Sequence, residues 1–367
     1  MKRHAIALLA ILAAGAAACQ LLVGIEDRGH AAPSEDASLD APLEAEASAP
    51  ERCHTEHAPP KLGSAAPGSS DVTLLTAVVA LDPSQGQVGL DLDGVCTCSP
   101  DPGSCKTTGA KEHCDTDGGV DNTGAPLFKK LVALSVGNAN TVNNLIDIGQ
   151  LGFVIRVTGY NGFEDDDEVE ISTFVSHGTP LDDAGVPTAP SRDGGVLAYT
   201  IDPTTTLTPD AASPETSPFA RARGFVRQHR LILTDSRIVV GLGALSMTLT
   251  NAVLMATIKP QNGAYALEDG VMTGRLETKD VLFSLGAFAI QSVPVCPGTA
   301  TYEGLKAVIC NAQDVSSDPK KDNTGTDCDA ISVGITFEAR PTKVTGVRSR
   351  DVLPGRGCDL DASFSCP

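Results

Sequence analysis

The chain has 367 residues, and 46 acidic side chains against 27 basic ones give it a net charge of −19 at pH 7. This acidic balance disfavours nucleic acid and anionic lipid headgroups as partners, because both attract positively charged protein surfaces. It is compatible with cation binding, but a solvated surface that binds no ion is the commoner cause of such a charge.

The first residues have the layout of a bacterial secretory signal. Lys2 and Arg3 precede a short apolar run that leads into Ala16-Ala17-Ala18-Cys19. This run is shorter than the roughly 20 apolar residues of a transmembrane helix. Its end resembles a lipobox, so we expect residues 1–18 to be a signal peptide and Cys19 to carry the lipid. The alternative is an ordinary secretory signal that happens to be cleaved beside a cysteine.

Residues 19–70 are predicted to be a lipidated, disordered stalk. They are rich in Ala, Pro, Ser, Asp and Glu, and such a segment buries too little apolar surface to offset its ordering entropy. Gln20 after the cysteine resembles the enterobacterial signal for sorting to the outer membrane. We therefore expect an outer-membrane lipid anchor that displays one folded domain, residues 71–367, on the periplasmic or cell-surface face.

Ten cysteines remain once Cys19 is assigned to the lipid, and an even number in an oxidising compartment predicts disulfides. They form two groups of five, so if all of them pair, at least one bridge joins the early group to the late one. Zinc is the competing use, but the paired C-x2-C blocks of structural zinc sites are missing. The predicted disulfide cysteines are Cys53, Cys96, Cys98, Cys105, Cys114, Cys296, Cys310, Cys328, Cys358 and Cys366.

Hydrophobic periodicity predicts a mainly β domain with a few short helices. The expected strands lie at 72–81, 154–160, 168–175, near 196–201, within 225–240, and at 247–258, 265–276 and 331–339. The expected helices lie at 127–134, 141–148, 279–290 and 302–310. Short strands between Gly/Pro turns are typical of a sandwich or a barrel. We expect a disulfide-stapled, β-sandwich-like single domain.

The segment 238–258 has no charged residue over a length that could cross a membrane. Its polar side chains, among them Ser246, Thr248 and Asn251, and its glycines at a turn position favour two buried strands instead.

Two Asp/Gly-rich loops are the sharpest candidates for a binding site. One is Asp91-Leu92-Asp93-Gly94, and the other runs from Asp115 to Asn122. Alternating carboxylates around glycine are typical of calcium loops, although the spacing is not that of an EF-hand. The alternative is that these residues only form Asx-turns between disulfides. The candidate calcium ligands are Asp91, Asp93, Asp115, Asp117, Asp121 and Asn122.

Other candidate sites are weaker. The acidic run 164–168 lies at a predicted hairpin tip, where it indicates either a solvated turn or a site for a metal or a basic ligand. Nucleophile-elbow, zinc-protease, P-loop and dinucleotide motifs are missing from the sequence. Ser176 and His177 are merely adjacent, so we assign no catalytic residue. Paired carboxylates for glycoside hydrolysis leave no local pattern.

Several blocks resemble a known group of proteins. The start of the mature chain, residues 19–27, resembles the leaders of uncharacterised myxobacterial envelope lipoproteins, and 91–98, 118–122 and 328–332 resemble patterns that recur in that group. This resemblance implies no assigned activity. Residues 153–172 are similar to hairpins of concanavalin-like sandwiches, and that resemblance implies glycan and calcium binding.

These observations together predict a lipid-anchored cell-envelope protein that acts as a non-enzymatic binding or structural module. Its expected partners are the membrane, through the lipid, and a glycan or an envelope protein, with no nucleic acid. No cofactor follows with certainty from the sequence; calcium is the candidate, and the alternative is that the Asp/Gly loops bind no ion. The alternative is a secreted hydrolase that cleaves polysaccharide with paired carboxylates.

Overall fold

The computed structural model describes residues 58–61, 72–98, 102–107, 113–136, 141–190, 196–205, 222–242, 245–285, 289–290, 293–349, 358 and 364–367. All of them belong to one packed unit, Pro50–Pro367. Cys19, the predicted signal peptide and most of the predicted stalk lie outside the described residues.

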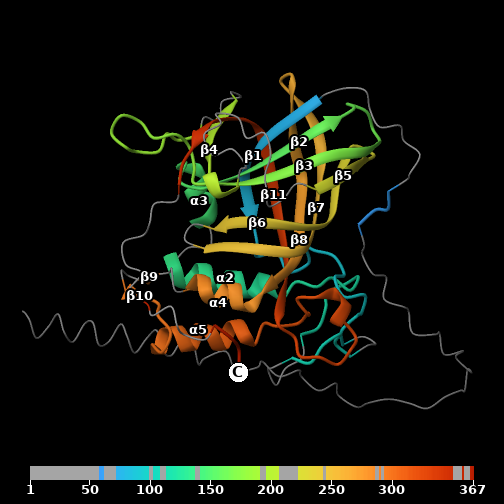
Figure 1. The fold of residues 1–367 in the computed structure, drawn as a ribbon, viewed down its shortest axis with the longest axis vertical. Helices are drawn as coiled ribbons and strands as arrows, with labels where there is room; N and C mark the ends of the chain where they lie inside the picture. The colour runs from blue at the N-terminus through green and yellow to red at the C-terminus, as the bar shows by residue number, and fades with distance from the viewer. Residues whose placement is uncertain are drawn as a thin grey trace, which may run out of the picture. The chain divides into compact units, whose positions relative to one another are not determined.

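Eight strands close into an antiparallel barrel (Figure 1). In barrel order they are β1 (Val72–Asp82), β2 (Gly152–Tyr160), β3 (Asp166–Ser176), β5 (Ala222–Arg227), β6 (Arg230–Leu242), β7 (Leu245–Gln261), β8 (Ala264–Glu277) and β11 (Ala330–Val347). The pairing of β11 with β1 closes the ring. The mainly β prediction is confirmed, but the sandwich is wrong: each strand has a partner on both sides, so closure removes the edges that two separate sheets would keep.

A ninth strand, β4 (Leu197–Ile201), pairs in parallel with the C-terminal part of β11. There β11 has run past its pairing with β1, which ends at Pro341. The predicted strand near 196–201 is therefore confirmed, but it lies outside the ring.

Two tight turns set the hairpins on one side of the barrel. Asn262 and Gly263 both have positive φ and connect β7 to β8, which is the familiar chemistry of a two-residue hairpin turn. Gln228 and His229 also have positive φ, 51° and 60°, and they divide the predicted 225–240 segment into β5 and β6. The sequence gives no Gly or Asn signal for this second turn.

One hydrophobic core fills the barrel. Along β11, the side chains Ile331, Val333, Ile335, Phe337 and Ala339 are all buried in it. The uncharged segment 238–258 forms the end of β6 and most of β7, which pair with each other, so the prediction of two buried strands is confirmed. In the described part of the chain no helix has the length and apolarity to span a membrane.

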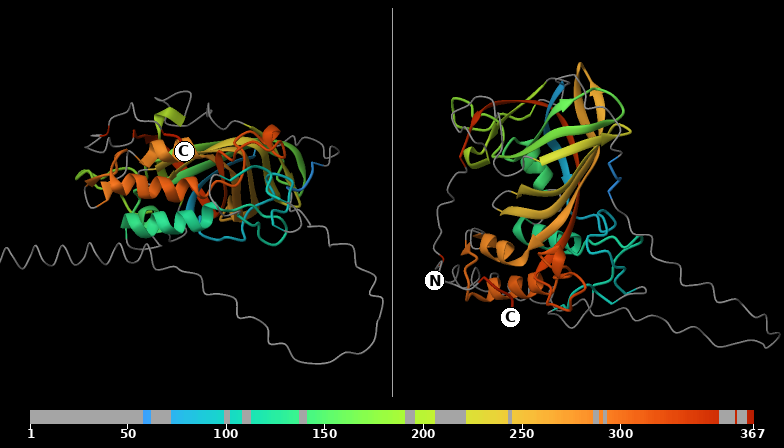
Figure 2. Two further views of the ribbon diagram at one scale, coloured as in Figure 1. Left: turned by 90° about the horizontal axis from the view of Figure 1, so that it is seen from below. Right: turned by 45° about the vertical axis from the view of Figure 1, so that its right-hand side comes forward.

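The α-helices add to the same core. α2 (Gly124–Val136), α4 (Thr278–Leu285) and α5 (Ala300–Cys310) lie together near one end of the barrel (Figures 1 and 2). Phe128, Leu282 and Ile309, one from each helix, are buried in the cluster that fills the barrel. α3 (Thr141–Asp147) packs against β1. These helices cover apolar surface that the strands leave exposed.

All four predicted helices are present, but the third is shorter than expected. α4 ends at Leu285, and Ile290 belongs instead to β9 (Ala289–Ile290), which pairs with β10 (Val293–Pro294). Two 3-10 turns, η1 (Pro203–Thr205) and η2 (Pro319–Lys321), complete the described elements.

Four disulfides are formed among the described residues: Cys98–Cys114, Cys105–Cys328, Cys296–Cys358 and Cys310–Cys366. Cys96 is disulfide-bonded as well, and Cys53 lies outside the described residues. Cys105–Cys328 spans 223 residues and joins the early cysteine group to the late one. The prediction of such a bridge is confirmed.

Candidate metal centre

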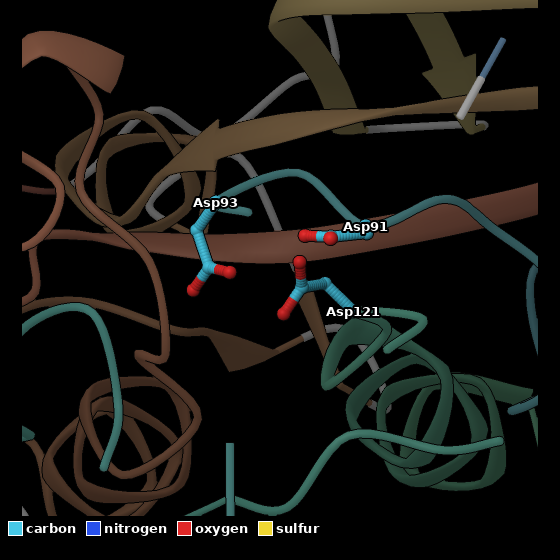
Figure 3. Close-up of side chains that lie close together, drawn as sticks. All are labelled: Asp91, Asp93 and Asp121. Carbon is cyan, nitrogen blue, oxygen red and sulfur yellow. The ribbon is translucent and has the colours of Figure 1, made fainter. Parts of the chain in front are cut away.

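Three aspartates from two separate loops meet beside the barrel. Asp91 and Asp93 lie in the segment that follows β1, and Asp121 lies just before α2. Their carboxylates face one another in Figure 3. One oxygen from each can be chosen so that all three lie within 4.8 Å of one another. This is the spacing of oxygen ligands around a single ion.

Backbone hydrogen bonds fix the two loops together. Leu92 N donates to Asp121 Oδ2 at 2.7 Å, and Asp121 N donates to Leu90 O at 3.2 Å. Within the first loop, Gly94 N donates to Asp91 Oδ1 at 2.6 Å and Val95 N donates to Asp93 Oδ1 at 2.9 Å. These are Asx-turn contacts. The turn interpretation and the ligand interpretation are therefore compatible, since each contact occupies only one oxygen of its carboxylate.

The cluster is shielded from solvent. Asp91, Asp93 and Asp121 are 7%, 8% and 2% exposed. A buried carboxylate is costly unless a positive charge or hydrogen bonds compensate for its lost hydration. The three side chains together form a site that favours either protonation or a bound cation.

The acid–base properties of the aspartates follow from this burial. Burial is the main cause that raises the pKa of Asp93, and the negative charges of Asp91 and Asp322 add to it. The pKa of Asp121 is raised well above its ordinary value by burial and by the charges of Asp93, Asp314 and Asp115. Burial likewise raises the pKa of Asp115 to about 7. A divalent cation would relieve this repulsion directly.

The nearest buried cationic side chain is committed elsewhere. Arg275 of β8 is 1% exposed, and its guanidinium donates to both carboxylate oxygens of Asp322. Its other hydrogen bonds go to Ser316 O and Leu92 O, each at 2.5 Å. Within the described residues, neither Asp93 nor Asp121 forms an ion pair with it or with any other base. No basic side chain among the described residues therefore offsets the charge that these carboxylates carry when they are ionised.

The structure sorts the six predicted ligands. Asp91, Asp93 and Asp121 come together, and Asp115 lies against Asp121 while accepting a hydrogen bond from Thr97 N at 2.6 Å. Asp117 is exposed and does not belong to the cluster of three. Asn122 is buried, but its amide is engaged.

Asn122 acts as a backbone clamp. Nδ2 donates to Gln85 O and Val88 O at 2.9 and 2.7 Å, and Oδ1 accepts from Gly334 N at 3.0 Å. The sequence predicted Asn122 as a ligand because it is the last residue of the Asp/Gly-rich loop 115–122. Its actual partners come from the segment after β1 and from β11, which no local pattern indicates.

Sequence reasoning missed three residues around the cluster. Ser104 lies beside Asp93, Asp314 is half-buried beside the first residue of β11, and Asp322 pairs with Arg275. Ser104 and Cys105 are neighbours in the cysteine-rich loop, which is the only signal that could have drawn attention to the serine.

The acidic run 164–168 is used within the fold. Asp166 is fully buried and accepts hydrogen bonds from Asn161 N at 2.7 Å and Glu168 N at 3.1 Å. Asp165 pairs with Arg227 at 2.9 Å, and Glu168 pairs with Arg223 at 3.2 Å. The basic partners of the acidic run therefore come from β5 of the same chain. The sequence had suggested a solvated turn, an external metal or a basic ligand at this run instead.

The adjacent Ser176 and His177 do not form a catalytic pair. The Ser176 hydroxyl exchanges hydrogen bonds with the backbone of Gly178, and His177 Nε2 lies 2.5 Å from Asp202 Oδ2. This contact positions His177 against β4's C-terminal end. It brings no nucleophile to the imidazole.

No family model, curated protein or solved structure matches this chain. The geometry of the carboxylate cluster and the sequence are therefore the features that point to a function.

Proposed function

We propose that this protein is a lipid-anchored, non-enzymatic binding module of the cell envelope, and that its disulfide-braced loops hold a calcium ion between Asp91, Asp93 and Asp121. The observation that carries the proposal is the meeting of these three carboxylates, from two loops, within 4.8 Å and nearly out of solvent contact. Oxygen-only ligand sets of high negative charge are those that hard divalent cations prefer.

Calcium suits the cluster better than magnesium. Magnesium requires a near-ideal octahedron and keeps several of its waters, whereas calcium accepts six to eight oxygens in irregular arrangements. Here backbone amides already hold one oxygen of Asp91, of Asp93 and of Asp121. The carboxylates are thus preorganised in an irregular set, and their burial leaves little room for a hydration shell.

The anchor part of the proposal comes from the sequence. The lipobox-like segment ending at Cys19 and the acidic stalk support an exported chain that is tethered by lipid, and so does the resemblance to myxobacterial envelope lipoproteins. The disulfides are consistent with an oxidising compartment. Labelling with a radioactive fatty acid tests this part: the expected result is a labelled chain that loses its label in Cys19→Ala.

A polysaccharide hydrolase gains no support from the buried cluster, because Asp91, Asp93 and Asp121 are too enclosed to reach a sugar chain. An open surface cavity of about 470 Å³ carries Asp82, Asp269 and Glu338 on its lining. The Asp82 carboxylate there accepts hydrogen bonds from Ser84 and Gln85. Replacing Glu338 and Asp269 by their amides would test hydrolysis at that place.

The central experiment is thermal unfolding of the oxidised protein in EDTA, in millimolar calcium and in millimolar magnesium. A ligand that binds only the folded state raises stability by mass action, and we expect calcium to raise the melting temperature by roughly 5 °C. Asp93→Asn should abolish most of this shift. The matched control is Asp117→Asn, which removes the same charge from the same loop region outside the cluster.

Two results would contradict the calcium site. One is an equal melting temperature in calcium and in EDTA. The other is an equal calcium shift in Asp93→Asn and Asp117→Asn, which would assign the effect to general screening of the acidic surface. A larger shift with magnesium than with calcium would replace the proposed ion but keep the site.

A further inference from the structure

Ser104 is a buried hydroxyl beside the carboxylate cluster. The residue is 1% exposed, and its Oγ has no partner in hydrogen-bonding geometry within the described residues. The same is true of Asp93 Oδ2. The hydroxyl is nevertheless near enough to Asp93 to lower the pKa of that carboxyl, against the larger effect of burial. Two buried oxygens thus lie beside each other, and apart from this mutual contact neither has a hydrogen-bonding partner among the described residues, which is unusual for buried polar atoms.

The backbone around Ser104 is held firmly. Ser104 O accepts from Asn323 N at 2.8 Å, Lys106 N donates to Thr326 O at 2.8 Å, and Cys328 N donates to Lys106 O at 2.8 Å. The next residue, Cys105, is bonded to Cys328. The hydroxyl is therefore positioned by its neighbours, and a buried hydroxyl held rigidly beside a carboxyl, with no other partner among the described residues, calls for an explanation.

Ser104 also borders an open cavity next to the cluster. A cavity of about 440 Å³ that opens to the surface is lined by Gly94, Val95, Ser104, Lys106 and Asn323 among others. Gly94 and Val95 directly follow Asp93. A cation that arrives through this cavity would therefore meet Ser104 before the carboxylates, which do not line the cavity.

We propose that the Ser104 hydroxyl is a fourth oxygen ligand of the bound cation and closes the site on the cavity side. This inference rests on the proposed calcium site. The three carboxylates each have one oxygen engaged by a backbone amide, so a calcium ion needs further oxygens to reach its usual number. A hydroxyl supplies one without adding negative charge to an already repulsive cluster.

The test compares calcium binding by Ser104→Ala with that of the unmodified protein, by isothermal titration of the oxidised chain with calcium chloride in chelator-treated buffer. We expect the affinity to fall roughly tenfold, the lower end of what supporting groups of metal sites contribute. Calcium release, measured by stopped-flow mixing with a chelator, should become faster by a similar factor. Ser104→Thr, which keeps the hydroxyl, should retain most of the affinity.

Ser172→Ala is the matched control. Ser172 of β3 is also 1% exposed, and its Oγ also has no partner among the described residues, so the change removes the same atom from an equally buried place. Its calcium affinity should be unchanged. Melting in EDTA checks folding: Ser104→Ala should be nearly as stable as the unmodified protein there, because among the described residues its hydroxyl loses only the contact with the Asp93 carboxyl.

The outcomes separate the two proposals. If the unmodified protein binds calcium and Ser104→Ala binds it within twofold of that affinity, Ser104 is not a ligand and the three-carboxylate site remains. If the unmodified protein binds no calcium, the proposed function itself fails. If Ser104→Ala does not fold, Ser104→Thr decides: normal folding with a tenfold loss of affinity would overturn the ligand role.

Discussion

Arg275 and Asp322 form a buried, two-pronged ion pair. Nη1 donates to Oδ1 at 2.9 Å and Nη2 donates to Oδ2 at 2.5 Å, and the side chains are 1% and 8% exposed. Nη2 also donates to the carbonyl of Leu92, between Asp91 and Asp93. One guanidinium thus connects the barrel strand β8, the segment after η2 and the loop of the candidate metal centre.

Removing this guanidinium should be strongly destabilising. Arg275→Met would leave the Asp322 carboxylate buried without its partner, and breaking such a pair typically costs about 3–5 kcal/mol. Urea unfolding under oxidising conditions measures the change. Arg275→Lys should also lose stability, because the ammonium group of lysine cannot form the two parallel hydrogen bonds that the guanidinium makes with Asp322. A loss below about 1 kcal/mol in Arg275→Met would mean that the pair adds little to the fold.

Asp121→Asn should have opposite effects with and without calcium. In EDTA we expect it to stabilise the protein by about 1 kcal/mol, because it removes a buried charge whose pKa burial and neighbouring aspartates raise. The amide oxygen can still accept from Leu92 N. In calcium the same variant should be the less stable one, because it has lost a charged ligand. Destabilisation by the same amount in both solutions would contradict this, and Asp117→Asn is the control.

Asp314 should make stability depend on pH. Burial raises its pKa to about 6, although hydrogen bonds from Ser332 N, at 2.8 Å, and from the Ser332 hydroxyl oppose this. Below the ordinary pKa of 3.8 the group is protonated in both states. Between 3.8 and about 6 only the unfolded chain loses the proton, so stability falls as pH rises, and above 6 the full cost persists.

The contribution of Asp314 to this fall should be on the order of 2–3 kcal/mol. Urea unfolding in EDTA at pH 4.5 and at pH 7.5 measures it, and Asp314→Asn should reduce the difference between the two values. His113, whose charge lowers the pKa of Asp314, faces the same group, so His113→Gln serves as a second check. An equal pH dependence in Asp314→Asn would contradict the assignment.

The Cys105–Cys328 bridge should matter more for stability than the short Cys98–Cys114 bridge. They span 223 and 16 residues, and closing a longer loop restricts the unfolded chain more. Replacing Cys105 and Cys328 by alanine should cost about 3–5 kcal/mol, against about 2–3 kcal/mol for Cys98 and Cys114. Denaturant unfolding of both double variants makes the comparison. Equal losses of stability in the two double variants would show that loop length does not determine how much each bridge stabilises the protein.

Calcium affinity provides a second measurement on the same variants. Because Cys105 follows Ser104 and Asp93 lies beside that serine, loss of Cys105–Cys328 should also weaken calcium binding. The double variant of Cys98 and Cys114 tests whether any lost bridge in this region has the same effect.

The sequence by itself determined the strands. Side chains that point to opposite faces alternate along 331–339 and 154–160, and this pattern can be seen from residues only two positions apart. It also located the uncharged strand pair within 238–258. It missed the turn at Gln228-His229, since neither residue type signals positive φ. Counting the cysteines predicted that one bridge joins the two groups, but pairing Cys105 with Cys328 needs the fold.

Only the tertiary structure decided between a sandwich and a closed barrel, because the pairing of β1 with β11 joins segments more than 250 residues apart and leaves no local pattern. The same holds for the candidate site. The sequence supplied Asp91, Asp93 and Asp121 as calcium-like residues, together with Asp117 and Asn122, which share their composition. Only burial and the approach of two loops distinguish the candidate ligands from the other residues. Asp117 is exposed, Asn122 clamps the backbone, and the three remaining carboxylates meet beside Ser104.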